Sequence, residues 1–363
     1  MSAPIAPGGT IGILGGGQLG RMLALAAARL GLKVHIHAPQ GDNPAFQVAD
    51  AVTCAPYEDE AALRAFAEAV DVITYEFENI PAAAVALLAG MKPLKPSARA
   101  LEITQDRWLE KSFIAGLGLP VAPFANIETG HDLEQAEAAI SLPAVLKTRR
   151  FGYDGKGQIM LKPGDDLARA WRDLGKVPCI LEGFVEFFAE VSIIAARNAD
   201  GDFTAHDMPR NVHEDHILRT STVPSGLPAK VEEQAREMAR RIAAALDYEG
   251  VLAVEFFASG EKGDVRLTIN EIAPRVHNSG HWTGAACVTS QFAQHIRAIC
   301  GWPLGDTARL ADCVMTNLLG EDVLDWQRLA ARPGAVLEIY GKREIRPGRK
   351  MGHVTQLRPG GLS

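Results

Sequence analysis

The sequence lacks the marks of a secreted, membrane-bound or nucleic-acid-binding protein. Its five cysteines are an odd number, lie far apart and form no C-x-x-C pair, which argues against a disulfide framework and a zinc site. No apolar run reaches membrane-spanning length, and the first ten residues lack a charged segment followed by an apolar one. The net charge of −7 argues against a broad basic surface for nucleic acid. We therefore expect a cytoplasmic protein with no membrane or nucleic-acid partner.

The chain is long enough for more than one domain. Its 363 residues exceed what one hydrophobic core usually organises, so two or three domains are expected. Hydrophobic residues make up 47% and charged residues 22%, as in ordinary globular enzymes. Alternating strand and helix patterns through about residue 100 predict an N-terminal domain built on a doubly wound parallel sheet.

A glycine-rich turn, GGGQLG at 15–20, lies between an expected strand at 10–14 and a helix at 21–30. It matches G-x-G-x-x-G, but a dinucleotide site also needs an acid about twenty residues on, at the end of the second strand. That strand, at 33–37, ends in His37, Ala38 and Pro39. We therefore interpret the turn as packing the strand against the helix, or as facing a substrate anion.

Two acidic residues, Glu76 and Glu78, follow the next buried strand at 70–74. Carboxylates at this position can point into the crevice where open α/β sheets bind ligands. They can equally cap the helix that begins near Pro81, and the sequence leaves both interpretations open.

A new helix is expected at 103–111, with Thr104 as its N-cap. Arg107 and Lys111 would lie one turn apart on the same face. Such a pair of cations can contact phosphates, or it can form ion pairs with Asp106 and Glu110, which is the more usual outcome.

The clearest signal is a strand–loop–strand hairpin. A strand at 144–147 ends in Lys147, the loop carries GYDGKGQ at 152–158, and a second strand follows at 159–161. A Walker loop would lead into a helix instead. Three glycines let the backbone close over phosphates, and Lys147 and Lys156 supply positive charge. Because a structural hairpin needs only one turn glycine, we favour a mobile nucleotide lid.

The next segments carry groups suited to a nucleoside. After a strand at 179–181, the extended segment 182–185 can offer backbone N–H and C=O groups to an adenine edge. Glu190 opens the strand at 191–197 and can accept hydrogen bonds from ribose hydroxyls. His213 is expected in a loop, 209–215, between two strands.

Two acids on successive strands predict a metal site. Glu255 interrupts an apolar strand at 251–257, and Asn270 and Glu271 follow the strand at 265–269. A charge within an apolar strand is costly unless it is paired or bound to a metal. Oxygen ligands of this kind suit Mg²⁺ shared with nucleotide phosphates. The alternative, a buried salt bridge with Arg275, leaves Asn270 unexplained.

The C-terminal part holds a basic cluster within an acidic protein. Its members are Lys342, Arg343, Arg346, Arg349 and Lys350. These charges repel one another unless an anion is near, so we interpret the cluster as one wall of a phosphate site, with a solvated basic loop as the alternative.

Taken together, these features resemble the ATP-grasp superfamily. Within it, GYDGKGQ at 152–158, APRVHNSGHWT at 273–283 and RPGRKMGH at 346–353 are similar to the N5-carboxyaminoimidazole ribonucleotide synthetase family, and the resemblance covers essentially the whole chain. One departure is Gly183, where the family commonly has a lysine, and it puts one side-chain contact to adenine in doubt.

The resemblance implies the fold and the domain boundaries. The expected fold is α/β, with a Rossmann-like domain at 1–102, an ATP-grasp domain at 103–300 whose lid subdomain covers about 113–185, and a small β-rich domain at 301–363. It also implies a homodimer.

The implied reaction is the carboxylation of the amine of 5-aminoimidazole ribonucleotide with ATP and bicarbonate, through carboxyphosphate, in purine biosynthesis. Mg²⁺ would be the metal cofactor, with Mn²⁺ as an alternative. A formate-dependent transformylase and a biotin carboxylase fit less well, because the C-terminal unit is short and the segment 276–283 is specific. An NAD-dependent oxidoreductase explains only residues 15–20. An inactive nucleotide-binding regulator would not need the set Glu255, Asn270 and Glu271.

The resemblance also implies a role for each matching residue. For ATP these are Arg107, Lys147, Gly152, Tyr153, Asp154, Gly155, Lys156, Gly157, Gln158, Glu182, Gly183, Phe184, Val185, Glu190, His213, Asn270 and Glu271. For the ribonucleotide and bicarbonate they are Gly17, Gln18, Leu19, Glu76, Tyr153, Asp154, Arg275, His277, Asn278, Ser279, Lys342 and Arg349. The expected metal ligands are Glu255, Glu271 and Asn270, and the expected catalytic residues are Arg275, His277, Tyr153, Asp154 and Lys156.

Overall fold

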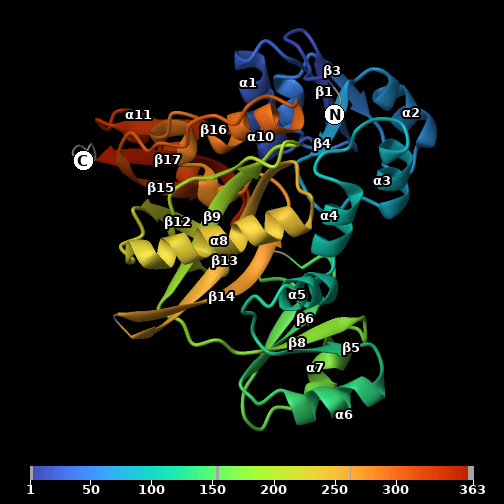
Figure 1. Cartoon of the computed structure of the whole chain (residues 1–363), viewed down its shortest axis with the longest axis vertical. Helices are drawn as coiled ribbons and strands as arrows, with labels where there is room; N and C mark the ends of the chain where they lie inside the picture. The colour runs from blue at the N-terminus through green and yellow to red at the C-terminus, as the bar shows by residue number, and fades with distance from the viewer. Residues whose placement is uncertain (1–2, 153–154, 262, 359–363) are drawn as a thin grey trace.

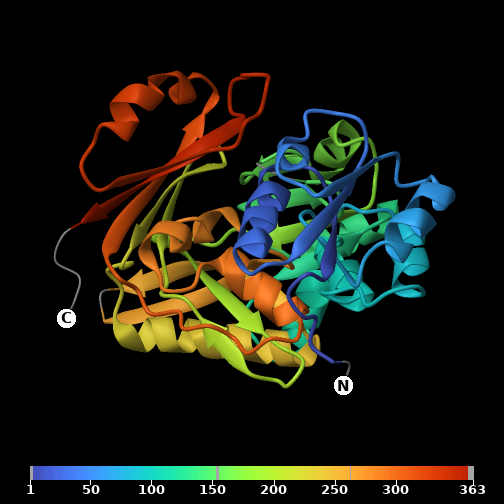
Figure 2. The same ribbon diagram turned by 90° about the horizontal axis from the view of Figure 1, so that it is seen from above.

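The computed structural model describes residues 3–152, 155–261 and 263–358, which form three sheets (Figure 1). The N-terminal sheet lies at the top of the view, a small sheet flanked by helices at the bottom, and the largest sheet between them. Seen from above, the C-terminal strands lie to one side of the N-terminal domain (Figure 2). The three sheets and their helices make the α/β ATP-grasp architecture that the sequence predicts.

The N-terminal sheet is parallel, in the order β3-β2-β1-β4. Because the chain runs outward from β1 to β3 and then returns to pair β4 with β1, the strand order reverses between β1 and β4. In open α/β sheets, ligands bind in the crevice beside the carboxyl ends of the strands at such a reversal. The strands are β1 (Thr10–Leu14), β2 (Lys33–Ala38), β3 (Ala51–Cys54) and β4 (Val72–Tyr75); the helices are α1 (Gln18–Arg29), η1 (Pro44–Gln47), α2 (Glu60–Glu68), α3 (Ala82–Ala89) and α4 (Ala98–Thr104).

The lid sheet is antiparallel, in the order β5-β8-β6-β7. The hairpin predicted from the glycine-rich loop is present, with β6 and β7 as its strands. Apolar side chains of the sheet and of two helices form a separate small core. The elements are α5 (Arg107–Gly116), β5 (Phe124–Ile127), α6 (Gly130–Ala139), β6 (Ala144–Thr148), β7 (Gln158–Leu161), α7 (Leu167–Asp173) and β8 (Cys179–Gly183).

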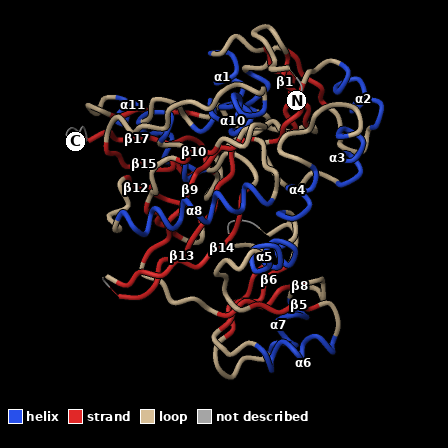
Figure 3. Tube along the Cα trace, viewed as in Figure 1, coloured by secondary structure: helices blue, strands red, loops and turns tan. Residues whose placement is uncertain are grey.

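The central sheet joins nine of the described strands, in the order β14-β13-β9-β11-β12-β15-β17-β16, with β10 beside β9. Figure 3 shows these strands running from the β13–β14 hairpin to the C-terminal unit. They are β9 (Ala189–Arg197), β10 (Phe203–Ala205), β11 (Arg210–Glu214), β12 (Ile217–Val223), β13 (Gly250–Glu261), β14 (Asp264–Ala273), β15 (Asp312–Leu319), β16 (Ala335–Ile339) and β17 (Lys350–Arg358). The intervening helices are α8 (Ala229–Ala245), η2 (Asn278–Gly280), α9 (Thr283–Ala286), α10 (Gln291–Ile299), η3 (Gly320–Asp325) and α11 (Trp326–Ala330).

Strand β9 is buried on both faces, and its alternating side chains enter two different cores. Ile193 and Ala195 pack with helix α8, whereas Ile194 and Ala196 pack with α10 and the N-terminal domain. Successive strand residues point to opposite faces. Ser192, which has the parity of Ile194, therefore points toward the face that carries α10 and the N-terminal domain.

Two local expectations differ from the structure. Thr104 ends α4, where its hydroxyl donates to Ala100 O at 2.9 Å, and Asp106 is the N-cap of α5. His213 lies in strand β11 rather than in a loop. The central sheet crosses residue 300, because β12 pairs with β15, so the domain boundaries remain predictions.

None of the described helices is both long and apolar enough to span a bilayer. All five cysteines are free thiols, and only Cys54 is exposed.

Candidate active site

Glu76 occupies the hydrogen-bond donors of the glycine turn. Its carboxylate accepts from the N–H of Gly17 and, at 2.7 Å, from the N–H of Gly20. A Cβ added to Gly17 would lie 2.6 Å from Glu76 Oε1, so the close approach requires glycine. Because these N–H groups already bind a carboxylate, they are not available to a dinucleotide pyrophosphate. This supports the interpretation of a packed turn, and Glu76 does not cap α3, whose N-cap is Pro81.

Arg275 is fixed by Glu78 of the N-terminal domain. Its Nε and one terminal nitrogen donate to the two carboxylate oxygens at 2.6 and 3.1 Å. Both side chains are largely buried, at 17% and 28% exposure. The expected alternative, a salt bridge between Arg275 and the carboxylates of Glu255 and Glu271, is therefore not what the structure shows. Glu78 therefore pairs with Arg275 and does not cap α3, and its place beside a ligand remains a prediction.

Two lysines converge on Glu182. Lys147 Nζ and Lys111 Nζ lie 3.1 and 3.3 Å from Glu182 Oε2. Burial alone would raise the pKa of this carboxyl, but the two cations outweigh it and lower the pKa to about 2. Lys147, which is 13% exposed, reaches the surface of the cluster, while Lys111 is fully enclosed. Lys111 therefore forms its ion pair with Glu182, and among the described residues it forms none with Glu110, the local partner that the sequence suggested.

A β-bulge places Glu271 on the active-site face. Glu255 pairs with Glu271 across β13 and β14, but the next pair is Phe256 with Ile269, which leaves Asn270 as the extra residue. Without the bulge, Glu271 would share the face of Ile269, which belongs to the apolar core under α8. The bulge therefore turns the carboxylate toward the N-terminal domain.

Helix α5 satisfies the backbone groups at this bulge. Lys111 Nζ donates to Asn270 O at 2.6 Å, and the N–H of Ile272 donates to Glu110 Oε1 at 2.6 Å. Burial and the neighbouring Glu271 raise the pKa of Glu110 to about 8. Buried backbone groups need partners, and here two side chains provide them. The sequence analysis missed this role for Lys111 and Glu110.

The two cross-strand carboxylates suit a divalent cation. Burial and the charge of Glu271 raise the pKa of Glu255 to about 8, as expected where two carboxylates face each other without a cation between them. Among the residues described, no three His, Cys, Asp or Glu side chains are grouped closely enough to hold an ion. Proteins usually bind Mg²⁺ through one or two carboxylates together with phosphates and water. The donor set of Glu255, Glu271 and Asn270 is thus compatible with the predicted metal.

Arg107 connects this site with the lid. One guanidinium nitrogen lies 3.2 Å from Glu271 Oε2, and the other donates to Gly152 O at 3.4 Å. In the lid loop, Gly155 and Gly157 have φ of +76° and +70°, a region that favours glycine. Gln158 opens β7, and Lys156 is exposed. The predicted residues Tyr153 and Asp154 lie outside the described residues.

The predicted adenine segment is partly engaged within the protein. The N–H of Gly183 donates to Pro123 O at 2.8 Å, and that of Phe184 to Pro143 O at 3.1 Å. For Val185, no hydrogen bond of the backbone N–H occurs among the described residues, and its contact with adenine remains a prediction. Nearby, His213 Nδ1 lies 2.9 Å from Glu190 Oε2, which brings two predicted nucleotide residues together.

His277 contacts Glu255, one of the predicted metal ligands. Its Nε2 lies 3.1 Å from Glu255 Oε1, and its Nδ1 lies 2.9 Å from Ser279 Oγ. Burial, followed by the charge of Arg275, lowers the pKa of His277 well below its usual value. Beside it, both side-chain polar atoms of Asn278 are buried and have no hydrogen-bond partner among the described residues. An unsatisfied buried amide at this place is suited to a polar ligand.

The C-terminal basic cluster meets an acid that the sequence analysis missed. Asp42, from the loop after β2, lies 3.0 Å from Arg349 and accepts from the N–H of Arg343 at 2.9 Å. Lys342 donates to Lys350 O at 2.6 Å and lies over the Tyr340 ring. The cluster is therefore partly neutralised across the domain interface. Burial, followed by the charge of Arg349, lowers the pKa of Lys342 to about 8.

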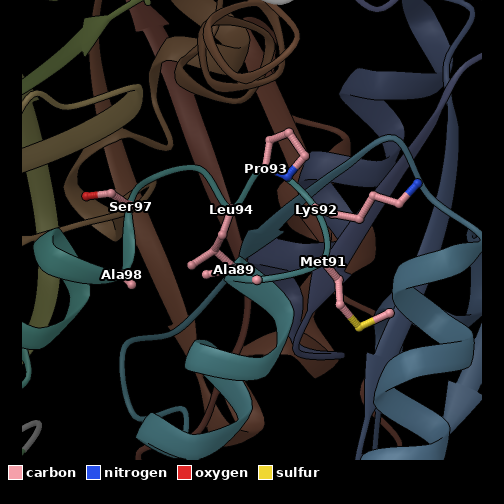
Figure 4. Close-up of a pocket in the computed structure, with 8 residues that line it drawn as sticks. Ala89, Met91, Lys92, Pro93, Leu94, Ser97 and Ala98 are labelled. Carbon is pink, nitrogen blue, oxygen red and sulfur yellow. The ribbon is translucent and has the colours of Figure 1, made fainter.

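A surface depression of about 390 Å³ on the N-terminal domain is not part of this site (Figure 4). Its lining comes from α3, the following turn and the start of α4: Ala89, Gly90, Met91, Lys92, Pro93, Leu94, Ser97 and Ala98. None of the predicted site residues lines it. Gln18 and Leu19 lie instead at the start of α1, beside Glu76.

Comparison with known families gives three consecutive matches. The ribonucleotide synthetase preATP-grasp domain matches residues 9–105, the ATP-grasp domain 112–292, and the phosphoribosylaminoimidazole carboxylase C-terminal domain 313–359.

Curated relatives match over nearly the whole chain. The N5-carboxyaminoimidazole ribonucleotide synthase of Brucella melitensis biotype 1 is 51% identical over 97% of both chains. That of Bacillus subtilis is 45% identical over 98% of this chain and 93% of its own.

Solved structures agree. An ADP complex of N5-carboxyaminoimidazole ribonucleotide synthetase superposes with a TM-score of 0.94 at 43% identity, over 99% of this chain and 95% of that one. The Aspergillus clavatus enzyme in complex with ADP and 5-aminoimidazole ribonucleotide gives 0.89 at 29% identity, over 97% and 94%. The chain therefore belongs to the N5-carboxyaminoimidazole ribonucleotide synthase family of ATP-grasp ligases.

Proposed function

We propose that the protein uses ATP and bicarbonate to carboxylate the amine of 5-aminoimidazole ribonucleotide, giving N5-carboxyaminoimidazole ribonucleotide, ADP and phosphate in purine biosynthesis. Family membership at 45–51% identity supports this reaction. The structural observation that carries it is the pairing of Glu255 with Glu271 across β13 and β14, within reach of Arg107 and the lid. A carboxylate pair suited to a metal thus lies beside a cation suited to a phosphate, which supports the proposal.

The chemistry begins with an activation that bicarbonate requires. A bicarbonate oxygen attacks the γ-phosphorus of ATP, the bond to ADP breaks, and carboxyphosphate results. Phosphoryl transfer of this kind depends on positioning and on neutralising charge. Lys147 and Arg107 are our candidates for the phosphate contacts, since both are held in place by carboxylates.

Mg²⁺, or Mn²⁺ in its place, would be held by Glu255 and Glu271, with Asn270 as a third oxygen ligand. When bound, the ion supplies positive charge to the ATP phosphates. The bulge at Asn270 and its two partners on α5 fix the direction of these ligands. Such support is what a metal site needs if its ligands are to stay oriented.

Carboxyphosphate would lie against Arg275, His277 and Asn278. Arg275 has its guanidinium fixed by Glu78, and Asn278 has an unpartnered amide. The amine nitrogen of the ribonucleotide attacks the carboxyl carbon of carboxyphosphate or of CO₂ released from it, the C–O bond to phosphate breaks, and the amine loses a proton. Tyr153, Asp154 and Lys156 remain the proposed catalytic residues of the lid.

The lid would also exclude water, because carboxyphosphate hydrolyses readily. Arg107 contacts both Glu271 and Gly152. Closure of the loop over bound nucleotide would therefore change the position of Arg107 relative to the proposed metal ligand Glu271.

The ribonucleotide 5′-phosphate is assigned to Lys342 and Arg349. Gly17, Gln18, Leu19 and Glu76 would border the same pocket from the N-terminal domain. Asp42 lies 3.0 Å from Arg349 and would hold its guanidinium in place for this contact. A homodimer in the cytoplasm remains part of the proposal.

A coupled assay of ADP release tests the function. With ATP, Mg²⁺ and bicarbonate present, adding 5-aminoimidazole ribonucleotide should strongly stimulate ADP formation. ATP hydrolysis that is indifferent to the ribonucleotide would retain the fold assignment and overturn the proposed acceptor.

A further inference from the structure

A continuous hydrogen-bonded chain of buried side chains ends at Glu255. It runs from Ser221 to Asn211 at 2.8 Å, from Asn211 to Ser192 at 3.1 Å, from Ser192 to Ser279 at 2.7 Å, from Ser279 to His277 at 2.9 Å, and from His277 to Glu255 at 3.1 Å. Ser192, Ser221 and Ser279 are fully buried, and Asn211 is 5% exposed. Strand pairing uses backbone groups and does not require polar side chains at these buried positions. The polarity of these four side chains therefore calls for another explanation.

The hydrogen positions along the chain follow from one backbone group. The N–H of Ser279 donates to His277 Nδ1 at 3.3 Å, so Nδ1 must be an acceptor. The proton of the neutral imidazole is therefore on Nε2, which donates to Glu255. The hydroxyl of Ser279 must then also donate to Nδ1.

The remaining directions follow in sequence. Since Ser279 has used its proton on His277, it accepts from the hydroxyl of Ser192. Ser192 in turn accepts from the Asn211 amide, and Asn211 Oδ1 accepts from the hydroxyl of Ser221. Every member donates toward Glu255, so each bond polarises the next in the same sense.

The strand registers keep this chain in line. Ser192 is the cross-strand partner of Glu255 on β9 and β13, and Asn211 is the partner of Ser221 on β11 and β12. Cross-strand partners share a face of the sheet. The alternation of β9 already directs Ser192 toward the active-site face.

We propose that Ser192, Asn211 and Ser221 are positioning residues, which act through Ser279 to hold His277 as an Nε2–H donor to Glu255. In this arrangement His277 fixes one oxygen of Glu255 by a hydrogen bond, and the remaining lone pairs of the carboxylate would stay available to the predicted cation. The inference rests on the proposed function, because it takes Glu255 as a ligand of the nucleotide-bound cation. Hydrogen-bond partners of metal ligands commonly contribute 10- to 100-fold to metal affinity or activity.

Calorimetric titration with ADP tests the proposal without turnover. For wild type and for Ser192→Ala, the ADP dissociation constant is measured with Mg²⁺ and with EDTA. The constant in EDTA divided by the constant in Mg²⁺ reports how much the metal strengthens ADP binding. We expect this ratio to fall about tenfold in Ser192→Ala, with metal-free ADP binding unchanged. Ser221→Ala, at the far end of the chain, should lower the ratio by about two- to threefold.

Thr355→Val is the matched control. Thr355 is fully buried on β17, and its hydroxyl has no partner in the part of the protein that the structure describes. The change therefore removes a buried hydroxyl that does not belong to the hydrogen-bonded chain. Its Mg²⁺ ratio should equal that of wild type. An unchanged ratio in Ser192→Ala, or an equal fall in Thr355→Val, would overturn the positioning role. A wild-type protein whose ADP affinity ignores Mg²⁺ would instead refute the proposed metal site.

Nitrogen NMR of histidine-labelled protein gives a second readout, which also serves if Ser192→Ala folds poorly. In wild type, His277 should show an unprotonated Nδ1 and a protonated Nε2. In Ser221→Ala, which leaves Ser192 in place, the Nδ1 signal should shift while the tautomer is retained. A wild-type ring with its proton on Nδ1 would contradict the deduced direction of the chain.

Discussion

Arg275 and Glu78 are joined by two hydrogen bonds that connect the end of β14 to the N-terminal domain. The two residues lie 197 positions apart in the sequence, so the pair links two distant segments of the chain. An arginine held in this way presents its guanidinium in one orientation, which is what a planar carboxylate or phosphate substrate requires.

Replacing Glu78 with glutamine should therefore impair the reaction. Glu78→Gln keeps the shape but removes the charge that holds Arg275, so kcat should fall about 10- to 100-fold, and stability by about 1–3 kcal/mol. Steady-state kinetics and urea unfolding measure the two effects. Glu60→Gln, which alters an exposed pair with Arg64 in the same domain, is the control and should leave both quantities as in wild type.

Replacing Glu271 should remove turnover by weakening the metal site. Glu271→Gln retains the hydrogen-bonding shape at the bulge but loses a charged oxygen ligand, so ADP release should drop about 100-fold. The measurement is ADP release as a function of Mg²⁺ concentration. Near-normal turnover at low Mg²⁺ would refute Glu271 as a ligand.

Replacing Arg349 should weaken the binding of the ribonucleotide and leave the binding of ATP unchanged. Arg349→Ala removes a charge-assisted phosphate contact, and we expect the KM for the ribonucleotide to rise about tenfold, with ATP binding spared. Arg343→Ala is the control, because the Arg343 side chain is 83% exposed in the same loop. If ATP affinity falls instead, the cluster belongs to the nucleotide site.

The lowered pKa of Lys342 predicts a pH dependence. Above about pH 8 the side chain loses its proton and its charge, so the KM for the ribonucleotide should rise as pH passes through that value. Lys342→Arg keeps the charge throughout this range and should flatten the profile. A KM that varies equally in both proteins would show that another group titrates.

The lid glycines allow a matched pair of variants. Gly157 and Gly164 both have positive φ, so alanine should cost about 1–2 kcal/mol at either position. Only at Gly157 would the new Cβ collide, 2.6 Å from Thr148 Oγ1. We expect kcat/KM for ATP to fall roughly 10- to 100-fold in Gly157→Ala and to change little in Gly164→Ala. Equal falls in kcat/KM in the two variants would mean that the collision with Thr148 adds nothing to the cost of the positive φ.

Patterns within one segment predicted much of the fold. The apolar runs of β1 and β2 are local, and the structure places both close to their expected bounds. The lid hairpin also followed from its glycine spacing. The predicted N-cap of α5 was wrong. Thr104 and Asp106 are both good N-cap residues, and only the tertiary contact between Asp106 and Arg149 favours Asp106.

The partners of the site residues could not be predicted in the same way. Asp42 and Arg349 meet across domains, and Lys111 meets Asn270 O because a bulge exposes that carbonyl. The sequence predicted that Asn270 and Glu271 belong to the site, yet the one-residue bulge that turns Glu271 to the correct face is a property of strand register. Register depends on both strands, and local periodicity describes only one.

Transfer of oxygen from bicarbonate to phosphate tests the central claim most directly. With ¹⁸O-labelled bicarbonate, ATP, Mg²⁺ and 5-aminoimidazole ribonucleotide, mass spectrometry of the released phosphate should find one ¹⁸O atom per molecule, because a bicarbonate oxygen becomes bonded to the γ-phosphorus. Phosphate without the label, formed at the same rate as ADP, would contradict carboxyphosphate formation and with it the proposed reaction.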